Sequence, residues 1–204
     1  MSARTLVVAL GVAVSGCAAG PALPGVAPAG PASEELLVPS GYGSLRQDQI
    51  TLTVETGDLQ LKVTPLEEWV TRLAAPDTWS RLSGLGVTHR AETELRLGRP
   101  ASLFLVSFFS RVPGTTFRPD DVELVNRGRR IRPLLIRPVT TGWGAQRLEA
   151  QETQLAVYAF DQEIDLQQPL TVEYEGETGA GWDEILRLLE AERGRARTRA
   201  GLDR

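Results

Sequence analysis

Residues 101–109 read ASLFLVSFF, and this stretch sets the architecture that the rest of the chain can adopt. Apolar side chains occupy both alternating faces of the stretch. A strand with two apolar faces has to be covered from both sides, as in the middle of a layered fold. We therefore predict a central buried strand here, with the other elements arranged around it.

Shorter strand signals lie on both sides of this stretch. Ile50–Val54 and Leu59–Val63 alternate apolar and polar residues, and Gly57-Asp58 between them is a hairpin turn signal. Further strands are expected at Thr93–Leu97, Val122–Val125, Ile131–Ile136, Leu155–Phe160 and Leu170–Tyr174.

Two sequence features constrain the strands predicted on either side of Gly128. Asn126-Arg127-Gly128 fits a short hairpin loop with Gly128 in the left-handed conformation. Pro133 and Pro138 each remove a backbone donor. They indicate that the second strand of this hairpin lies at a sheet edge or is broken by a bulge.

Helix signals are fewer. Thr64-Pro65-Leu66-Glu67 combines a capping residue, a proline for the first helical position and a glutamate for a capping box. A second short helical turn is expected at Thr78–Leu85. A final helix is expected at Gly181–Arg193, with a basic tail that frays after it.

Many short strands joined by turns predict a mainly β fold. We expect an antiparallel β-sandwich with a short helical insertion and a C-terminal helix, and a small β-barrel is the alternative. Residues 117–134, FRPDDVELVNRGRRIRPL, resemble the strand–turn–strand signature of immunoglobulin-like modules found on bacterial surface lipoproteins. The resemblance implies an immunoglobulin-like sandwich without the cysteine pair of antibody domains.

The amino terminus carries a targeting signal. Arg4 precedes Leu6–Val14, an apolar run too short to span a bilayer as a permanent helix but of the right length for a secretory signal. The sequence that follows, Val14-Ser15-Gly16-Cys17, resembles the lipobox of bacterial lipoproteins. An ordinary signal peptide with a chance cysteine is the alternative.

The lipobox resemblance implies a specific maturation. Cleavage would fall between Gly16 and Cys17, and Cys17 would carry a diacylglycerol thioether and an acyl chain such as palmitate. The protein's membrane partner would then be reached through this lipid. Ala18 is not the aspartate linked with inner-membrane retention, which favours the outer membrane.

Composition divides the chain into four expected parts. Residues 18–33, AAGPALPGVAPAGPAS, are too poor in large apolar side chains to offset the entropy of ordering them. The parts are a signal peptide (1–16), a lipid anchor with a Pro/Ala/Gly-rich tether (17–47), a β-sandwich domain (48–180), and a C-terminal helix with a basic tail (181–204).

Several function classes are disfavoured. Loss of Arg4 with the signal takes the formal net charge from −4 to about −5, which does not suggest a nucleic-acid binder. The single cysteine, once lipidated, leaves no disulfide or cysteine nucleophile. The single histidine, His89, excludes a multi-histidine zinc site within one chain, and phosphate-binding loop motifs are absent. We therefore expect no metal, no cofactor and no catalytic residue.

An arginine cluster surrounds the Gly128 hairpin. Alternation along the strand places Arg130 and Arg132 on one face, where they could bind an anionic glycan, a phosphate or a membrane surface. The alternative is a charged edge strand that resists aggregation. The cluster consists of Arg127, Arg129, Arg130, Arg132 and Arg137.

Two other clusters are weaker signals. Trp143 lies between glycines, either as an exposed loop tip that binds a sugar or protein, or folded back onto the core. Asp161, Glu163 and Asp165 could ligate calcium but lack the glycine and distal glutamate of an EF-hand loop, so a solvated turn is favoured.

The sequence thus predicts a non-enzymatic envelope lipoprotein, in which a tethered β-sandwich interacts with an envelope protein or the wall. An accessory module that binds an anionic glycan through Arg130, Arg132 and Trp143 is the alternative.

Overall fold

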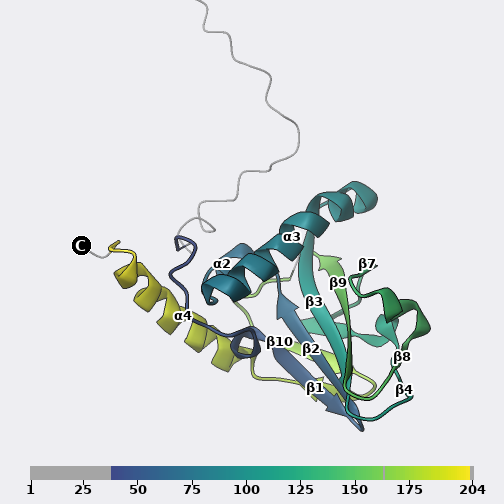
Figure 1. Cartoon of the computed structure of the whole chain (residues 1–204). Helices are drawn as coiled ribbons and strands as arrows, with labels where there is room; N and C mark the ends of the chain where they lie inside the picture. Colours follow the sequence, from purple (N-terminus) through teal and green to yellow (C-terminus); the bar gives the residue numbers. More distant parts are fainter. Residues whose placement is uncertain (1–37, 163, 203–204) are drawn as a thin grey trace, which may run out of the picture.

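A computed structural model describes residues 38–162 and 164–202. The expected signal peptide, Cys17 and most of the expected tether lie outside these residues, as does Glu163. The described chain forms antiparallel sheets with helices on the outside (Figure 1).

The strands are β1 (Leu52–Thr56), β2 (Leu59–Pro65), β3 (Ala101–Ser110), β4 (Thr115–Thr116), β5 (Glu123–Asn126), β6 (Arg129–Ile131), β7 (Leu135–Pro138), β8 (Arg147–Leu148), β9 (Glu152–Asp161), β10 (Leu170–Tyr174) and β11 (Glu177–Gly179). The helices are α2 (Glu68–Thr71), α3 (Pro76–Leu97) and α4 (Trp182–Arg199), with 3₁₀ turns η1 (Gln47–Ile50), η2 (Pro119–Asp121) and η3 (Thr141–Ala145).

Two open sheets make up most of the structure. One has the order β1-β2-β3-β9-β7 and the other the order β11-β10-β5-β6, and the small β4–β8 pair stands apart. The strand pairs of both larger sheets are antiparallel. The prediction of a mainly β, antiparallel fold is confirmed, and two open sheets are consistent with a sandwich.

The predicted central strand is β3. It pairs with β2 through Phe104–Ser110 on one side and along its whole length with β9 on the other. The ring of Phe108 lies 5.5 Å from that of Tyr174 on β10, so this face of β3 packs against the second sheet. Helix α3 covers the other side of the five-stranded sheet (Figure 1). Both apolar faces of β3 are therefore used, as the sequence predicts.

The two sheets approach closely where β11 meets β1. A Cβ atom on Gly179 would lie 2.5 Å from the carbonyl oxygen of Thr53 and 2.8 Å from a methyl group of Val54. Only a residue without a side chain fits between these backbones. Gly179 thus closes one side of the sandwich.

At the opposite edges of the two sheets lie β7 and β6. The predicted strand Ile131–Ile136 is in fact divided between these two strands, which belong to different sheets and lie at their edges. Pro133 lies in the connection, in agreement with the predicted break. Arg127 and Gly128 form the predicted hairpin loop, with φ values of 52° and 73°.

The first helix begins later than the sequence predicts. Strand β2 continues to Pro65, which pairs with Phe104. Thr64 is buried and shares a hydrogen bond of 2.7 Å with Thr51 instead of capping a helix. The ladder of the five-stranded sheet thus outweighs the local capping signal, and α2 spans a single turn.

Two helices are longer than expected. Residues 93–97, expected as a strand, are the last turns of α3, which ends at Gly98 in the left-handed conformation. As a result Leu95 faces solvent, and Thr93 is buried. The basic segment expected to fray is part of α4, because Glu192 and Ala196 are buried there.

Candidate functional site

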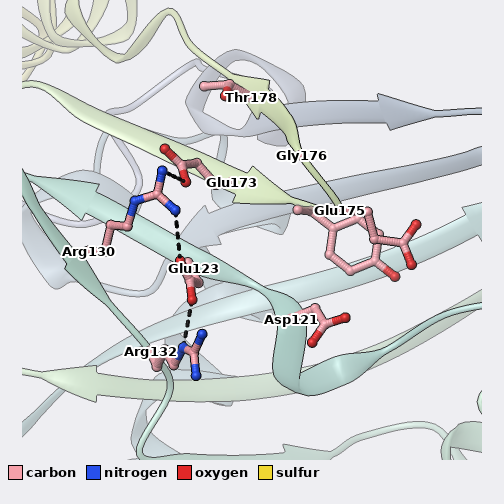
Figure 2. A pocket seen from close by; sticks show the side chains of 9 residues that line it. Asp121, Glu123, Arg130, Arg132, Glu173, Glu175, Gly176 and Thr178 are labelled. Carbon is pink, nitrogen blue, oxygen red and sulfur yellow. Dashed lines mark hydrogen bonds and ion pairs between the residues drawn. The ribbon is translucent and has the colours of Figure 1, made fainter.

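Arg130 and Arg132 lie together, as alternation predicts. They line a hollow of about 330 Å³ on the outer face of the four-stranded sheet. Figure 2 shows the two guanidinium groups on either side of Glu123. The remaining lining residues come from η2, β10, the β10–β11 turn and β11: Asp121, Glu123, Glu173, Tyr174, Glu175, Gly176 and Thr178.

Strand register explains the position of Arg130. Glu123 on β5 lies directly opposite Glu173 on β10, and like charges in this relation destabilise a sheet. Arg130 bridges them, with nitrogen–oxygen distances of 3.6 Å to Glu123 and 2.9 Å to Glu173 (Figure 2). Its charge is therefore engaged within the sheet.

Arg132 also contacts Glu123. Its Nε lies 2.6 Å from Oε1 of the carboxylate, and this hydrogen bond raises the pKa of the arginine. Both arginines remain more than two-thirds exposed, so their outer edges can still contact a ligand.

The other end of the hollow is acidic. Asp121 and Glu175 lie there, away from the two arginines (Figure 2). Tyr174 also lines the hollow, and its hydroxyl accepts a hydrogen bond of 2.9 Å from the backbone N–H of Arg118. Burial raises the pKa of Tyr174 to about 12. Four carboxylates against two guanidinium groups leave the hollow with a net negative charge.

Trp143 takes the second of its two predicted positions. Its side chain is buried, with the ring centroid 5.1 Å from that of Phe117 and 5.7 Å from that of Phe108. The indole fills a cluster between the sheets instead of forming an exposed loop tip. The structure therefore does not bring Trp143 together with Arg130 and Arg132 at one surface.

His89 lies in the middle of α3 and not before a strand. Its Nδ1 is buried without a hydrogen-bond partner among the described residues, and burial together with the charge of Arg137 lowers its pKa. In a Ser-His-Asp triad a carboxylate orients this nitrogen. The surroundings of His89 do not supply that arrangement.

The acidic side chains at the end of β9 and just after it form ion pairs with separate arginines. Asp161 accepts a hydrogen bond of 2.9 Å from Arg99, and Asp165 pairs with Arg127. Glu163 lies outside the described residues. Within the described part of the chain, no group of three or more histidine, cysteine or acidic residues is arranged to hold a metal ion.

A second carboxylate network, at Glu192 on α4, is not predicted from the sequence. Glu192 is fully buried and accepts hydrogen bonds from Ser44 N at 2.9 Å, Ser44 Oγ at 2.8 Å and Arg195 Nε at 2.8 Å, and from Arg199. It ties the first described segment to the last helix. The sequence signal is only a glutamate spaced three and seven residues before arginines.

No protein-family model, curated protein or solved structure matches this chain. Among residues 38–162 and 164–202, no helix combines the length and the apolar character needed to cross a membrane.

Proposed function

We propose that this protein is a bacterial envelope lipoprotein, anchored by lipid on Cys17, whose β-sandwich is a non-enzymatic interaction module. The observation that carries the proposal is Val14-Ser15-Gly16-Cys17, which follows a short apolar run and contains the only cysteine of the chain. The outer membrane is its expected location.

The fold supports this proposal in two ways. The described residues form a folded unit that follows the proposed anchor in the sequence. The largest apolar side chains, among them Trp182, Tyr158 and Phe104, are used in the core. The domain is thus stabilised by its core, without a cysteine.

Replacement of the anchoring cysteine tests the proposal. In cells fed labelled palmitate, Cys17→Ser should abolish labelling and release the protein from the membrane fraction, because only the sulfur of Cys17 can form the thioether. Ser15→Ala is the matched control, since it keeps a small residue in the motif and should leave labelling unchanged. A Cys17→Ser protein that is still labelled and sediments with membranes would contradict the assignment.

A second candidate function rests on the hollow beside β6. Arg130 and Arg132 present exposed guanidinium edges on one concave surface, which suits the carboxylate or sulfate of an acidic glycan. Asp121 and Glu175 repel a ligand that is purely anionic. The ligand must therefore also offer hydrogen-bond donors, as the hydroxyl groups of a glycan do.

Binding to a panel of acidic and neutral glycans tests this second function. Arg132→Ala should weaken binding of an acidic glycan by roughly tenfold or more, as expected for loss of one charge-assisted contact. Arg111→Ala, an exposed arginine in the loop after β3, is the control. Equal affinities for the parent protein and Arg132→Ala would exclude this arginine as a ligand contact.

A further inference from the structure

Helix α4 is divided by charge into two halves. Its first half, residues 182–191, contains Asp183, Glu184 and Glu190 against Arg187. Its second half, residues 192–199, contains four arginines against the buried Glu192. This basic half stands out in a chain with a formal net charge of −4. A surface of the opposite sign to the whole molecule points to an anionic partner.

The first described segment of the chain runs beside this basic half (Figure 1). Arg199 Nε donates a hydrogen bond of 2.8 Å to the carbonyl oxygen of Tyr42, and Ser44 binds Glu192. The same segment is held on its other side by α2, where Arg72 donates to the carbonyl oxygen of Val38 at 3.1 Å. Residues 38–46 therefore enter the domain at the basic end of α4.

The exposed side chains at this end are of two kinds. Arg195 and Arg199 keep 54% and 41% of their side-chain surface exposed, even though both contact Glu192. Tyr42 is 41% and Leu202 is 49% exposed, and both belong to the small set of large apolar side chains left at the surface. Arg193 is different, because its guanidinium lies over the ring of Trp69, 5.5 Å from the centroid.

We propose that this end of the molecule, formed by Tyr42, Arg195, Arg199 and Leu202, is a contact surface for anionic phospholipid headgroups. Arginine attracts anionic lipid, and tyrosine beside apolar residues suits the interface between headgroups and acyl chains. The proposal rests on the proposed function, because the lipid on Cys17 is what brings the surface to a bilayer.

Because the proposed lipid anchor holds the domain near the bilayer, a surface with low affinity for lipid is enough to make contact. Cys17 precedes the first described residue, Val38, in the sequence, and Tyr42 and Ser44 contact α4 at this surface. Each arginine near an anionic bilayer raises partitioning by roughly fivefold. A few arginines give only weak binding to a free chain, but tethering makes the contact intramolecular and raises its effective concentration. The surface would thus orient the domain on the membrane.

Vesicle sedimentation tests the surface without the lipid anchor. The probe is the chain 17–204 with Cys17→Ser, which retains every residue that the structure describes. It should bind phosphatidylglycerol vesicles at low salt, bind phosphatidylcholine vesicles much less, and dissociate at high salt. Arg195→Gln should lower partitioning roughly fivefold, as expected for the loss of one arginine.

Arg111→Gln is the matched control, since it removes the same charge outside this surface and should change partitioning little. If Arg195→Gln does not fold, Arg199→Gln, which leaves the bond of Arg195 to Glu192 in place, should give a similar, roughly fivefold loss. Equal binding to both vesicle types, or equal losses for Arg195→Gln and Arg111→Gln, would overturn the proposal. Neither result would affect the palmitate-labelling test of Cys17, so the two proposals fail separately.

Discussion

Glu192 shows how one residue can join the two ends of a domain. Burial by itself would raise the pKa of this carboxyl. Hydrogen bonds from Arg195, Ser44 and Arg199 outweigh that effect and leave the pKa below the ordinary glutamate value of 4.5. A buried carboxylate is tolerated only when such donors replace its hydration. The charged form is therefore part of the folded structure.

Glu192→Gln should lower the free energy of unfolding by about 3 kcal/mol at neutral pH, because the hydrogen bonds lose their charge and the amide presents a donor to Arg195 or Ser44. Urea titration measures this difference. The control is Glu190→Gln, an exposed glutamate on the same helix, which should change stability by no more than about 0.5 kcal/mol.

The same residue gives stability a pH dependence. Since the pKa is lower in the folded than in the unfolded state, the contribution of Glu192 is fully present above about pH 4.5 and is lost as pH falls through the folded value. The difference in the free energy of unfolding between the parent protein and Glu192→Gln should become smaller as the pH is lowered. If this difference in the free energy of unfolding stayed constant down to acidic pH, the carboxylate would not be the stabilising form.

At the scale of elements, a local sequence signal predicts the observed structure where no long-range strand pairing competes with it. The Gly57-Asp58 and Arg127-Gly128 hairpins form as predicted, because a glycine at positive φ specifies each loop by itself. Strand β3 is likewise predicted, since its two apolar faces require two covering layers.

The errors at this scale share a cause. Thr93, Leu95 and Leu97 alternate like a strand, yet α3 continues through them because the preceding turns are already helical and pack on the five-stranded sheet. Likewise, Thr64 carries a capping signal but belongs to β2, because a ladder partner on β3 is available. Short periodic patterns are ambiguous until neighbouring elements determine which one forms.

The arginine site depends both on local alternation along one strand and on the register between strands. Alternation predicts that Arg130 and Arg132 share a face, and they do. That Glu123 and Glu173 occupy the same face depends on the register of β5 with β10, which brings together residues 50 positions apart. The sequence therefore predicts a basic patch, and the sheet converts it into a mixed and net acidic hollow.

At the scale of the whole molecule, the two sheets are joined at β1 and β11 and share one aromatic core. Phe108 connects Phe117, Trp143 and Tyr174, which come from the β4–η2 connection, η3 and β10. Close approach of the sheet backbones at Gly179 is needed for this core to close.

Gly179→Ala should therefore destabilise the protein by about 1–3 kcal/mol, as for other overpacked sites, because the new methyl group would overlap the carbonyl oxygen of Thr53. Thermal or urea unfolding provides the measurement. Gly144→Ala is the comparison, since a Cβ there has no neighbour within 4 Å and should change stability by less than about 0.5 kcal/mol. Similar losses for both variants would argue against a tight junction at Gly179.

The sequence by itself determined the antiparallel β class, the central strand, the hairpin loops and the shared face of Arg130 and Arg132. These depend on side-chain periodicity and backbone preference, which act over a few residues. Only the tertiary structure determined that Trp143 belongs to the core, that carboxylates surround the arginines, and that Glu192 ties residue 44 to α4. Such contacts join residues far apart in sequence, and their energies depend on burial and register, which no local pattern encodes.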